Sequence, residues 1–139
     1  MTSPAKLKFT IYQGATFREH LDRQTIPYEV VADACGNLTK VCDGTAVPPT
    51  DITDENYTGC EARMQLREDV DSATVLLDCT TANGRRALSG KRLTIHFTDA
   101  ETAAMGFGSC IGHVEVIRST GDVERQYEIT FALNKEGTR

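Results

Sequence analysis

The five cysteines are the residues of this chain best suited to chemistry, and two of them stand apart from the rest. Cys35 and Cys42 lie in the polar, glycine-containing stretch VADACGNLTKVCDG, outside any clear strand pattern, which predicts that both thiols are accessible. Two accessible thiols can close a small loop with each other or reach a neighbouring subunit. Because the total is odd, at least one cysteine has no disulfide partner in its own chain, which favours a disulfide between subunits.

The other three cysteines, Cys60, Cys79 and Cys110, fall on the apolar side of alternating segments. This position is typical of buried thiols that pack as small hydrophobic groups. If strands 60–67 and 73–79 pair through a turn at 68–72, however, Cys60 faces Cys79, and a cross-strand disulfide has suitable geometry. The sequence leaves both interpretations open.

Signals for catalysis or metal binding are weak. None of the cysteines forms a Cys-x-x-Cys pair, which argues against a zinc ribbon or a thioredoxin-like site. Cys110 and His113 are three residues apart, so on a strand they point to opposite faces. The chain has no nucleophile elbow, no phosphate-binding glycine loop and no HExxH motif. We therefore expect no catalytic site, no cofactor and no metal ion.

Length and charge narrow the class of protein further. The chain has 139 residues, which predicts a single domain over residues 1–139. Its net charge is -5 and its basic residues occur only in short pairs, which argues against nucleic-acid binding. No apolar run approaches the roughly 20 residues that cross a bilayer, and the N-terminus lacks the apolar core of a signal peptide. We expect a protein made in a cytoplasm, with no membrane partner.

Two-residue alternation is the main structural signal and predicts strands. It is clear at 60–67, 93–97 and 127–133, and weaker at 9–11 and 15–24. Turns are predicted at Asn83-Gly84, at 89–91 and at 119–122.

The last of these turns predicts a register for the C-terminal hairpin. If Thr120-Gly121 forms a two-residue loop, the apolar residues of both strands share one face. The opposed pairs are then Cys110 with Phe131, Val114 with Tyr127, and Val116 with Arg125.

One short helix interrupts the strands. Thr98 and Glu101 have the spacing of a capping box, three alanines and a methionine fall within the next segment, and Gly106 ends it. We expect this helix to cross from one sheet to another. The strands, turns and helix together predict an all-β fold, an antiparallel immunoglobulin-like β-sandwich with one short helical crossover.

Residues 27–56 form a long insertion in this fold. Pro27, Pro48 and Pro49 bracket a weakly patterned stretch that includes Cys35 and Cys42. Long exposed loops often carry function, so we interpret the insertion as a contact surface. A tolerated surface insertion fits the pattern equally well.

Three stretches carry a resemblance to a known family: YTGCEARMQLRED, SATVLLDCTTANGR, and the segment from TDAETAAMGFG to the C-terminal Thr-Arg. The chain resembles small virion structural proteins of tailed bacteriophages, which are similar to the β-sandwich N-terminal domain of phage baseplate upper proteins. The resemblance covers about residues 6 to 26 and 52 to 139. The chain departs from the family pattern in two ways: its segment 27–56 is longer, and it carries cysteines where the family has other residues.

The resemblance implies a non-enzymatic virion component of the neck, collar, tail or baseplate, assembled in the cytoplasm of a bacterial host. Its partners would be copies of itself, arranged as a homo-oligomeric ring, and other virion proteins. In such a particle Cys35 and Cys42 are candidates for disulfides between subunits, because thiols oxidise once the particle leaves the cell.

Two other classes of function stay open. A carbohydrate- or ligand-binding β-sandwich would need an exposed aromatic platform, yet the chain has no tryptophan and four tyrosines. A thiol-dependent enzyme would need a base positioned beside the nucleophile, and the sequence contains no motif for one.

Overall fold

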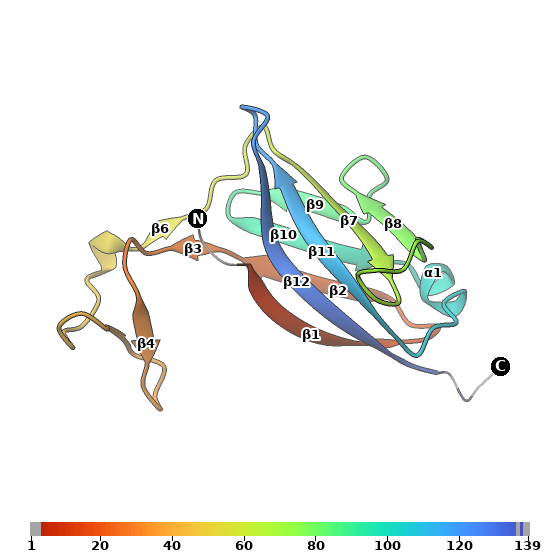
Figure 1. Ribbon diagram of the computed structural model, residues 1–139, viewed down its shortest axis with the longest axis horizontal. Helices are drawn as coiled ribbons and strands as arrows, with labels where there is room; N and C mark the ends of the chain where they lie inside the picture. The colour runs from red at the N-terminus through yellow and green to blue at the C-terminus, as the bar shows by residue number, and fades with distance from the viewer. Residues whose placement is uncertain (1–3, 136, 138–139) are drawn as a thin grey trace.

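Alternating apolar residues build two facing sheets in the computed structural model, which describes residues 4–135 and 137 (Figure 1). The larger sheet has the strand order β1 (Ala5–Tyr12), β12 (Val123–Asn134), β11 (Ser109–Ile117), β7 (Glu61–Arg67), β8 (Leu77–Thr80). The smaller sheet has the order β2 (Phe17–Asp22), β10 (Arg92–Phe97), β9 (Arg86–Ser89). The prediction of an all-β sandwich is confirmed.

The core lies between the sheets, where the two-residue period sends every second side chain. In β10, Leu93, Ile95 and Phe97 are all 0% exposed, whereas Thr94 and His96 between them are half-buried. Four phenylalanine rings from both sheets meet at the centre, with centroids between 5.6 and 6.2 Å apart. These rings come from Phe9, Phe17, Phe97 and Phe131. Aromatic pairs at such distances add about 0.5–1.5 kcal/mol each beyond the burial of their area.

One strand pair departs from the antiparallel pattern. β1 runs parallel to β12, with Leu7 beside Ile129 and Phe9 beside Phe131, while the other described pairings are antiparallel. The turn after β1 leads into β2 of the opposite sheet, so β1 has no hairpin partner next to it in the sequence. The tertiary fold, rather than a turn, therefore sets its direction.

The C-terminal hairpin follows the predicted register for two pairs and departs from it at the third. Cys110 lies opposite Phe131 and Val114 opposite Tyr127, but a bulge after Val114 places Val116 opposite Glu124, so the predicted Val116–Arg125 pair is wrong. The loop is also one residue longer than predicted. The Arg118 amide donates to the Asp122 carbonyl, and residue 121 is a glycine with φ 95°, as in three-residue hairpin loops.

The predicted pairing of Cys60 with Cys79 is wrong. β8 begins at Leu77 rather than at residue 73, and Met64 lies opposite Cys79, a shift of four residues. The connection from β7 to β8 spans residues 68–76 and is longer than the predicted turn at 68–72. Cys60 precedes β7, and all five cysteines of the described chain are free thiols.

Two of the predicted turns have different roles. The turn at 89–91 joins β9 and β10 as a hairpin, as expected, with Gly90 at φ 57°. The turn at Asn83-Gly84 is not a hairpin within one sheet, because β8 and β9 belong to different sheets. The side-chain oxygen of Asn83 accepts from the Thr80 and Arg85 amides and so stabilises the turn between β8 and β9.

The predicted helix is present as α1 (Asp99–Ala103), which ends before Gly106. Its capping box is formed, since the Thr98 hydroxyl accepts from the Glu101 amide and the Glu101 carboxylate accepts from the Thr98 amide. The helix crosses from β10 to β11 and so from the smaller sheet to the larger one, as expected. No helix among the described residues is long and apolar enough to cross a membrane.

Residues 24–54, which we call the arm, project from one end of the sandwich (Figure 1). The arm begins and ends in a short ribbon of β3 (Gln24–Thr25) and β6 (Thr53–Asp54). Beyond it lie a second ribbon of β4 (Val30–Ala32) and β5 (Leu38–Lys40) and the short 3-10 helix η1 (Pro49–Asp51). The predicted insertion is therefore a folded ribbon rather than an irregular loop.

Candidate interaction site: the arm and its root

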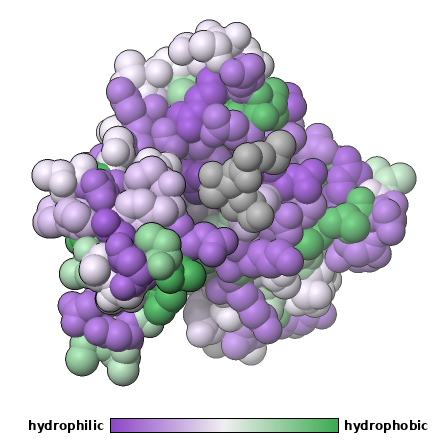
Figure 2. All heavy atoms as spheres, turned by 60° about the vertical axis from the view of Figure 1, so that its left-hand side comes forward, coloured by the Kyte–Doolittle hydropathy of each residue, from purple (hydrophilic) through white to green (hydrophobic). Residues whose placement is uncertain are grey.

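The arm has no core of its own. Among residues 24–54, all of which the structure describes, none is buried. Val31 is 50% exposed and Val41 is 53% exposed. Figure 2 turns this side of the molecule toward the viewer and shows hydrophobic atoms at the surface among hydrophilic ones. An isolated two-stranded ribbon is at best marginally stable in water. Burial of this segment against another surface would therefore stabilise it.

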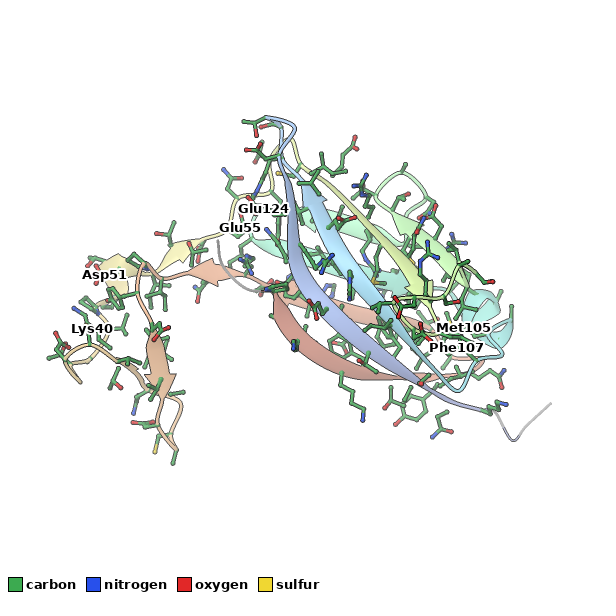
Figure 3. All side chains as sticks on the ribbon, in the orientation of Figure 1. Lys40, Asp51, Glu55, Met105, Phe107 and Glu124 are labelled. Carbon is green, nitrogen blue, oxygen red and sulfur yellow. The ribbon has the colours of Figure 1, made fainter. Side chains whose placement is uncertain are left out.

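Tyr28 provides the main side-chain contact inside the arm. Its hydroxyl donates to Asp51 Oδ2 at 2.5 Å, and Lys40 Nζ lies 5.0 Å from the centre of its ring. Figure 3 shows Lys40 and Asp51 on this part of the arm. Desolvation, followed by the hydrogen bond to Asp51, raises the pKa of Tyr28 to about 12. Tyr28 therefore joins the β4–β5 ribbon to η1.

Two aspartates fold the turns that carry the exposed thiols. Asp33 Oδ1 accepts from the amides of Cys35 and Asn37, both at 2.9 Å. Hydrogen bonds from the backbone, that of Asn37 first, lower the pKa of Asp33. Asp43 Oδ1 accepts from the Thr45 amide at 2.9 Å and from its hydroxyl at 2.6 Å. Aspartate favours such turns because its short side chain can bond the backbone two residues on.

Cys35 and Cys42 are both exposed, as the sequence predicts, but they lie at opposite ends of β5. Cys35 is in the tip that joins β4 to β5, and Cys42 is in the turn after Lys40. No disulfide joins the two residues in the structure, where both are free and exposed thiols. The local Cys35–Cys42 clip and a disulfide between subunits both stay predictions.

A charged cluster holds the arm at its root. The Glu55 carboxylate accepts two hydrogen bonds from Arg118, at 2.7 and 3.0 Å, and Arg118 also donates to Glu124 at 2.9 Å. Figure 3 shows Glu55 and Glu124 at this junction. The Glu55 side chain is only 8% exposed, and its hydrogen bonds with Arg118 lower its pKa. A paired guanidinium and carboxylate of this kind is among the stronger and more directional contacts in proteins.

Buried polar groups extend this cluster into the sandwich. The Tyr57 hydroxyl donates to Gln126 Oε1 at 2.6 Å, and Gln126 is 2% exposed. Burial raises the pKa of Tyr57. Arg23 Nε lies 3.4 Å from Glu55 Oε2 but outside hydrogen-bond geometry. A cleft of about 650 Å³ beside these groups is lined largely by charged side chains.

The backbone brings the two ends of the arm together at this root. The Glu55 amide donates to the Arg23 carbonyl at 3.0 Å, and the Arg23 amide donates to the Lys91 carbonyl at 3.0 Å. The Tyr57 amide donates to the Gly90 carbonyl at 2.8 Å. The chain thus leaves and re-enters the sandwich at one point beside the β9–β10 hairpin, and the direction of the arm is set there. Sequence patterns could not reveal this site, because its members come from segments far apart in the chain.

The remaining cysteines belong to the sandwich. Cys79 is 0% exposed and Cys110 is 1% exposed. Burial raises the pKa of the Cys79 thiol to about 11 and that of Cys110 to about 12, in keeping with their interpretation as buried thiols. Cys60 is half-buried at the root, where its sulfur lies 3.8 Å from Arg118 Nη1.

The part of the chain that the structure describes contains no cluster of metal-ligating side chains. No group of three or more His, Cys, Asp or Glu side chains there could hold an ion. On β11, Cys110 faces the core and His113 faces outward, as their spacing predicts. A shallow polar depression of about 480 Å³ on that outer face includes His113, Arg63 and Arg67.

Arg86 is a buried residue that the sequence analysis missed. It is 1% exposed, and its guanidinium donates to the Arg85 carbonyl and to Met64 Sδ, both at 2.9 Å. Its Nε has no hydrogen-bond partner, and no carboxylate pairs with it, among the residues described. Burial lowers the pKa of Arg86 to about 10, and the Phe97 ring lies 5.8 Å from its central carbon. Because an arginine in an alternating strand is expected to face solvent, nothing in the neighbouring sequence indicates that Arg86 is buried.

Comparison with known proteins adds no relative: neither a family model nor a curated protein sequence matches the chain. Its function is therefore inferred from the fold, the arm and the root.

Proposed function

We propose that the protein is a non-enzymatic structural component of a tailed-phage virion, a homo-oligomeric adaptor or attachment protein. The observation that carries the proposal is the arm, a folded ribbon without buried residues that projects from a packed sandwich. Such a segment gains most of its stabilisation from a neighbouring subunit. The resemblance of residues 6 to 26 and 52 to 139 to phage virion proteins supports the choice of particle.

Disulfides between subunits are the second part of this proposal. Cys35 and Cys42 face outward from opposite ends of β5, so each can meet a thiol of another chain. When two thiols join, one S–S bond forms and the pair loses two protons and two electrons. Dissolved oxygen accepts these electrons once the particle has left the reducing cytoplasm. The bond would then resist dissociation of the assembled particle.

A carbohydrate-binding sandwich has less support. Binding sugars on an aromatic platform would require exposed rings grouped on one face. Of the four tyrosines, Tyr57 and Tyr127 are buried and Tyr28 is engaged with Asp51, which leaves Tyr12 at 60% exposed. The chain has no tryptophan. One exposed ring does not make a platform.

The decisive experiment examines purified particles of the phage that encodes the chain. We expect mass spectrometry to find the chain in the particles, and a non-reducing gel to show species that collapse to monomer with reductant. Cross-linked peptides should contain Cys35 or Cys42. Particles with Cys35→Ser and Cys42→Ser should lose those species, whereas the control Cys60→Ser should keep them.

Two results would count against the proposal. Particles that lack the chain would contradict the structural role itself. Particles that contain the chain as monomer in both gels would contradict only the disulfides.

A further inference from the structure

The outer edge of β1 is open. β1 is the terminal strand of the larger sheet, and none of the described residues forms a strand on its far side (Figure 1). An edge strand presents unpaired N–H and C=O groups that can accept another strand. β1 is eight residues long, and two of its core-facing residues, Leu7 and Phe9, are only half-buried, whereas Ile11 is fully buried. The sandwich therefore ends in a long, incompletely covered edge.

The same edge is basic. Lys6 and Lys8 point outward from β1, both are exposed, and neither forms an ion pair within the described chain. β1 has no acidic residue. Lysines on an edge strand discourage indiscriminate pairing, and they also select for a partner strand that carries acids.

The arm has the complementary features. Its residues 24–54 include five acidic side chains and one lysine, so the arm carries a net charge of -4 out of the -5 of the whole chain. Glu29, Val31 and Asp33 alternate along β4 and its two flanking residues, and all three are exposed. Two-residue alternation places these three on one face and Val30 on the other.

β4 also has a free edge. Among the described residues it pairs with β5 alone, whereas β5 is covered on its other side by the chain at Thr45 to Val47. A strand with an open edge, an exposed apolar residue and flanking acids is suited to strand addition, in which main-chain hydrogen bonds provide affinity and alternate side chains provide specificity.

We propose that β4 of one copy adds to the open edge of β1 in a second copy. The larger sheet then extends across the contact, with Glu29 and Asp33 on the same face as Lys6 and Lys8. Val30 of the arm covers the half-buried edge residues Leu7 and Phe9. The arm gains the burial that it lacks in the single chain. This inference names the contact between copies, and for its biological setting it rests on the proposed function.

A second copy fits the β1 edge better than the alternatives within the chain. The arm points away from its own sandwich, with its direction set at the Glu55–Arg118 root (Figure 1). Pairing of β1 with β1 of another copy would bring together strands that each carry two lysines and no acid. Like charges opposed across a strand pair destabilise it.

The test uses two variants of the full chain. The edge variant carries Lys6→Glu and Lys8→Glu, both at exposed positions. The arm variant carries Glu29→Gln, Asp33→Asn and Asp43→Asn, in which the asparagine oxygens can still accept the hydrogen bonds of the two turns. Circular dichroism confirms folding, and sedimentation velocity over a concentration series under reducing conditions measures association. The matched control is Arg63→Glu and Arg67→Glu, which reverses charge on the outer face of β7.

We expect the wild-type chain and the control to associate, and salt to weaken this association. Each variant alone should be monomeric. An equimolar mixture should recover a 1:1 complex, because the edge variant keeps a normal arm and the arm variant keeps a normal edge. Hydrogen exchange of the wild-type chain should slow at β1 amides as concentration rises.

Several results would overturn the proposal. A wild-type chain that stays monomeric at all concentrations contradicts it, as does an edge variant that associates normally, which would indicate contact between two arms. A mixture of the variants that remains monomeric also contradicts it. Because the experiment uses purified chain and the test of function uses particles, either proposal can fail while the other stands.

Discussion

At the scale of single residues, Arg86 is a charge held in the core without a counter-charge among the residues that the structure describes. Its guanidinium contacts a carbonyl, a thioether and an aromatic face, which are weaker partners than a carboxylate. Removing a cation from water costs several kcal/mol, and only part of this is returned by such contacts. Arg86 therefore limits the stability of the sandwich.

We predict that Arg86→Met stabilises the fold by about 1–4 kcal/mol, because an apolar side chain of similar reach fills the space without desolvating a charge. Denaturation with guanidinium chloride measures the change. The control Arg63→Met, at an exposed position on β7, should change stability by no more than about 1 kcal/mol, because it removes only a surface ion pair with Glu115. A loss of stability in Arg86→Met would mean that the buried hydrogen bonds contribute more than desolvation costs.

At the scale of elements, Gly112 of β11 leaves space for the core-facing side chains of its neighbour β7. A Cβ added at Gly112 would lie 2.4 Å from Met64 Sδ and 3.0 Å from Leu66 Cδ2. Gly112 thus makes room for Met64 of β7, which contacts Arg86 of β9 and lies opposite Cys79 of β8.

We predict that Gly112→Ala destabilises the protein by about 1–3 kcal/mol, the usual cost of overpacking a core. Gly108→Ala is a matched control, since a Cβ there meets nothing within 4 Å. Thermal unfolding of both variants measures the difference. Equal stability of the two would show that Met64 moves aside at no cost.

The root of the arm predicts a dependence of stability on pH. Arg118 holds the pKa of Glu55 below its ordinary value of 4.5, so the unfolded chain binds a proton at higher pH than the folded chain does. The stabilisation is complete above pH about 4.5 and is lost as pH falls through the lower, folded pKa.

We therefore expect Glu55→Gln to unfold more easily than wild type near neutral pH, with a smaller loss of stability on acidification. Denaturation curves at neutral and acidic pH measure both effects. The exposed Glu61→Gln is the control and should follow the wild type. Parallel pH profiles for Glu55→Gln and wild type would contradict the role of the Glu55–Arg118 pair.

At the scale of the whole molecule, the protein divides into a sandwich that has the core and an arm that has none. Every buried residue that the structure describes lies outside residues 24–54. The ends of the arm meet at the root, where the Glu55 amide bonds the Arg23 carbonyl. The division separates stability, which resides in the sandwich, from the contact with partners that we propose for the arm.

This division predicts that the arm can be removed. Replacing residues 24–54 by a short glycine-serine link should leave a folded sandwich with a thermal midpoint within a few degrees of the wild type, because no core contact is lost. Calorimetry measures the midpoint. A shortened chain that fails to fold would show that the arm stabilises the sandwich.

The amino-acid sequence by itself determined the features that depend on neighbours along the chain. Two-residue alternation predicted strands β7, β10 and β12, the Thr98–Glu101 box predicted α1, and the position of Cys79 and Cys110 on apolar faces predicted their burial. The proline-bracketed segment marked the arm. Each of these signals follows from local geometry, in which the period of a strand or the cap of a helix is encoded within a few residues.

Only the tertiary structure decided which distant residues meet. Alternation assigns a residue to a face but does not choose among registers that differ by an even number of residues, and Cys79 accordingly lies opposite Met64 rather than Cys60. The parallel position of β1, the burial of Arg86 and the Glu55–Arg118 root likewise depend on contacts between segments far apart in the chain. These contacts form because the two sheets must share one core, a condition that no short stretch of sequence expresses.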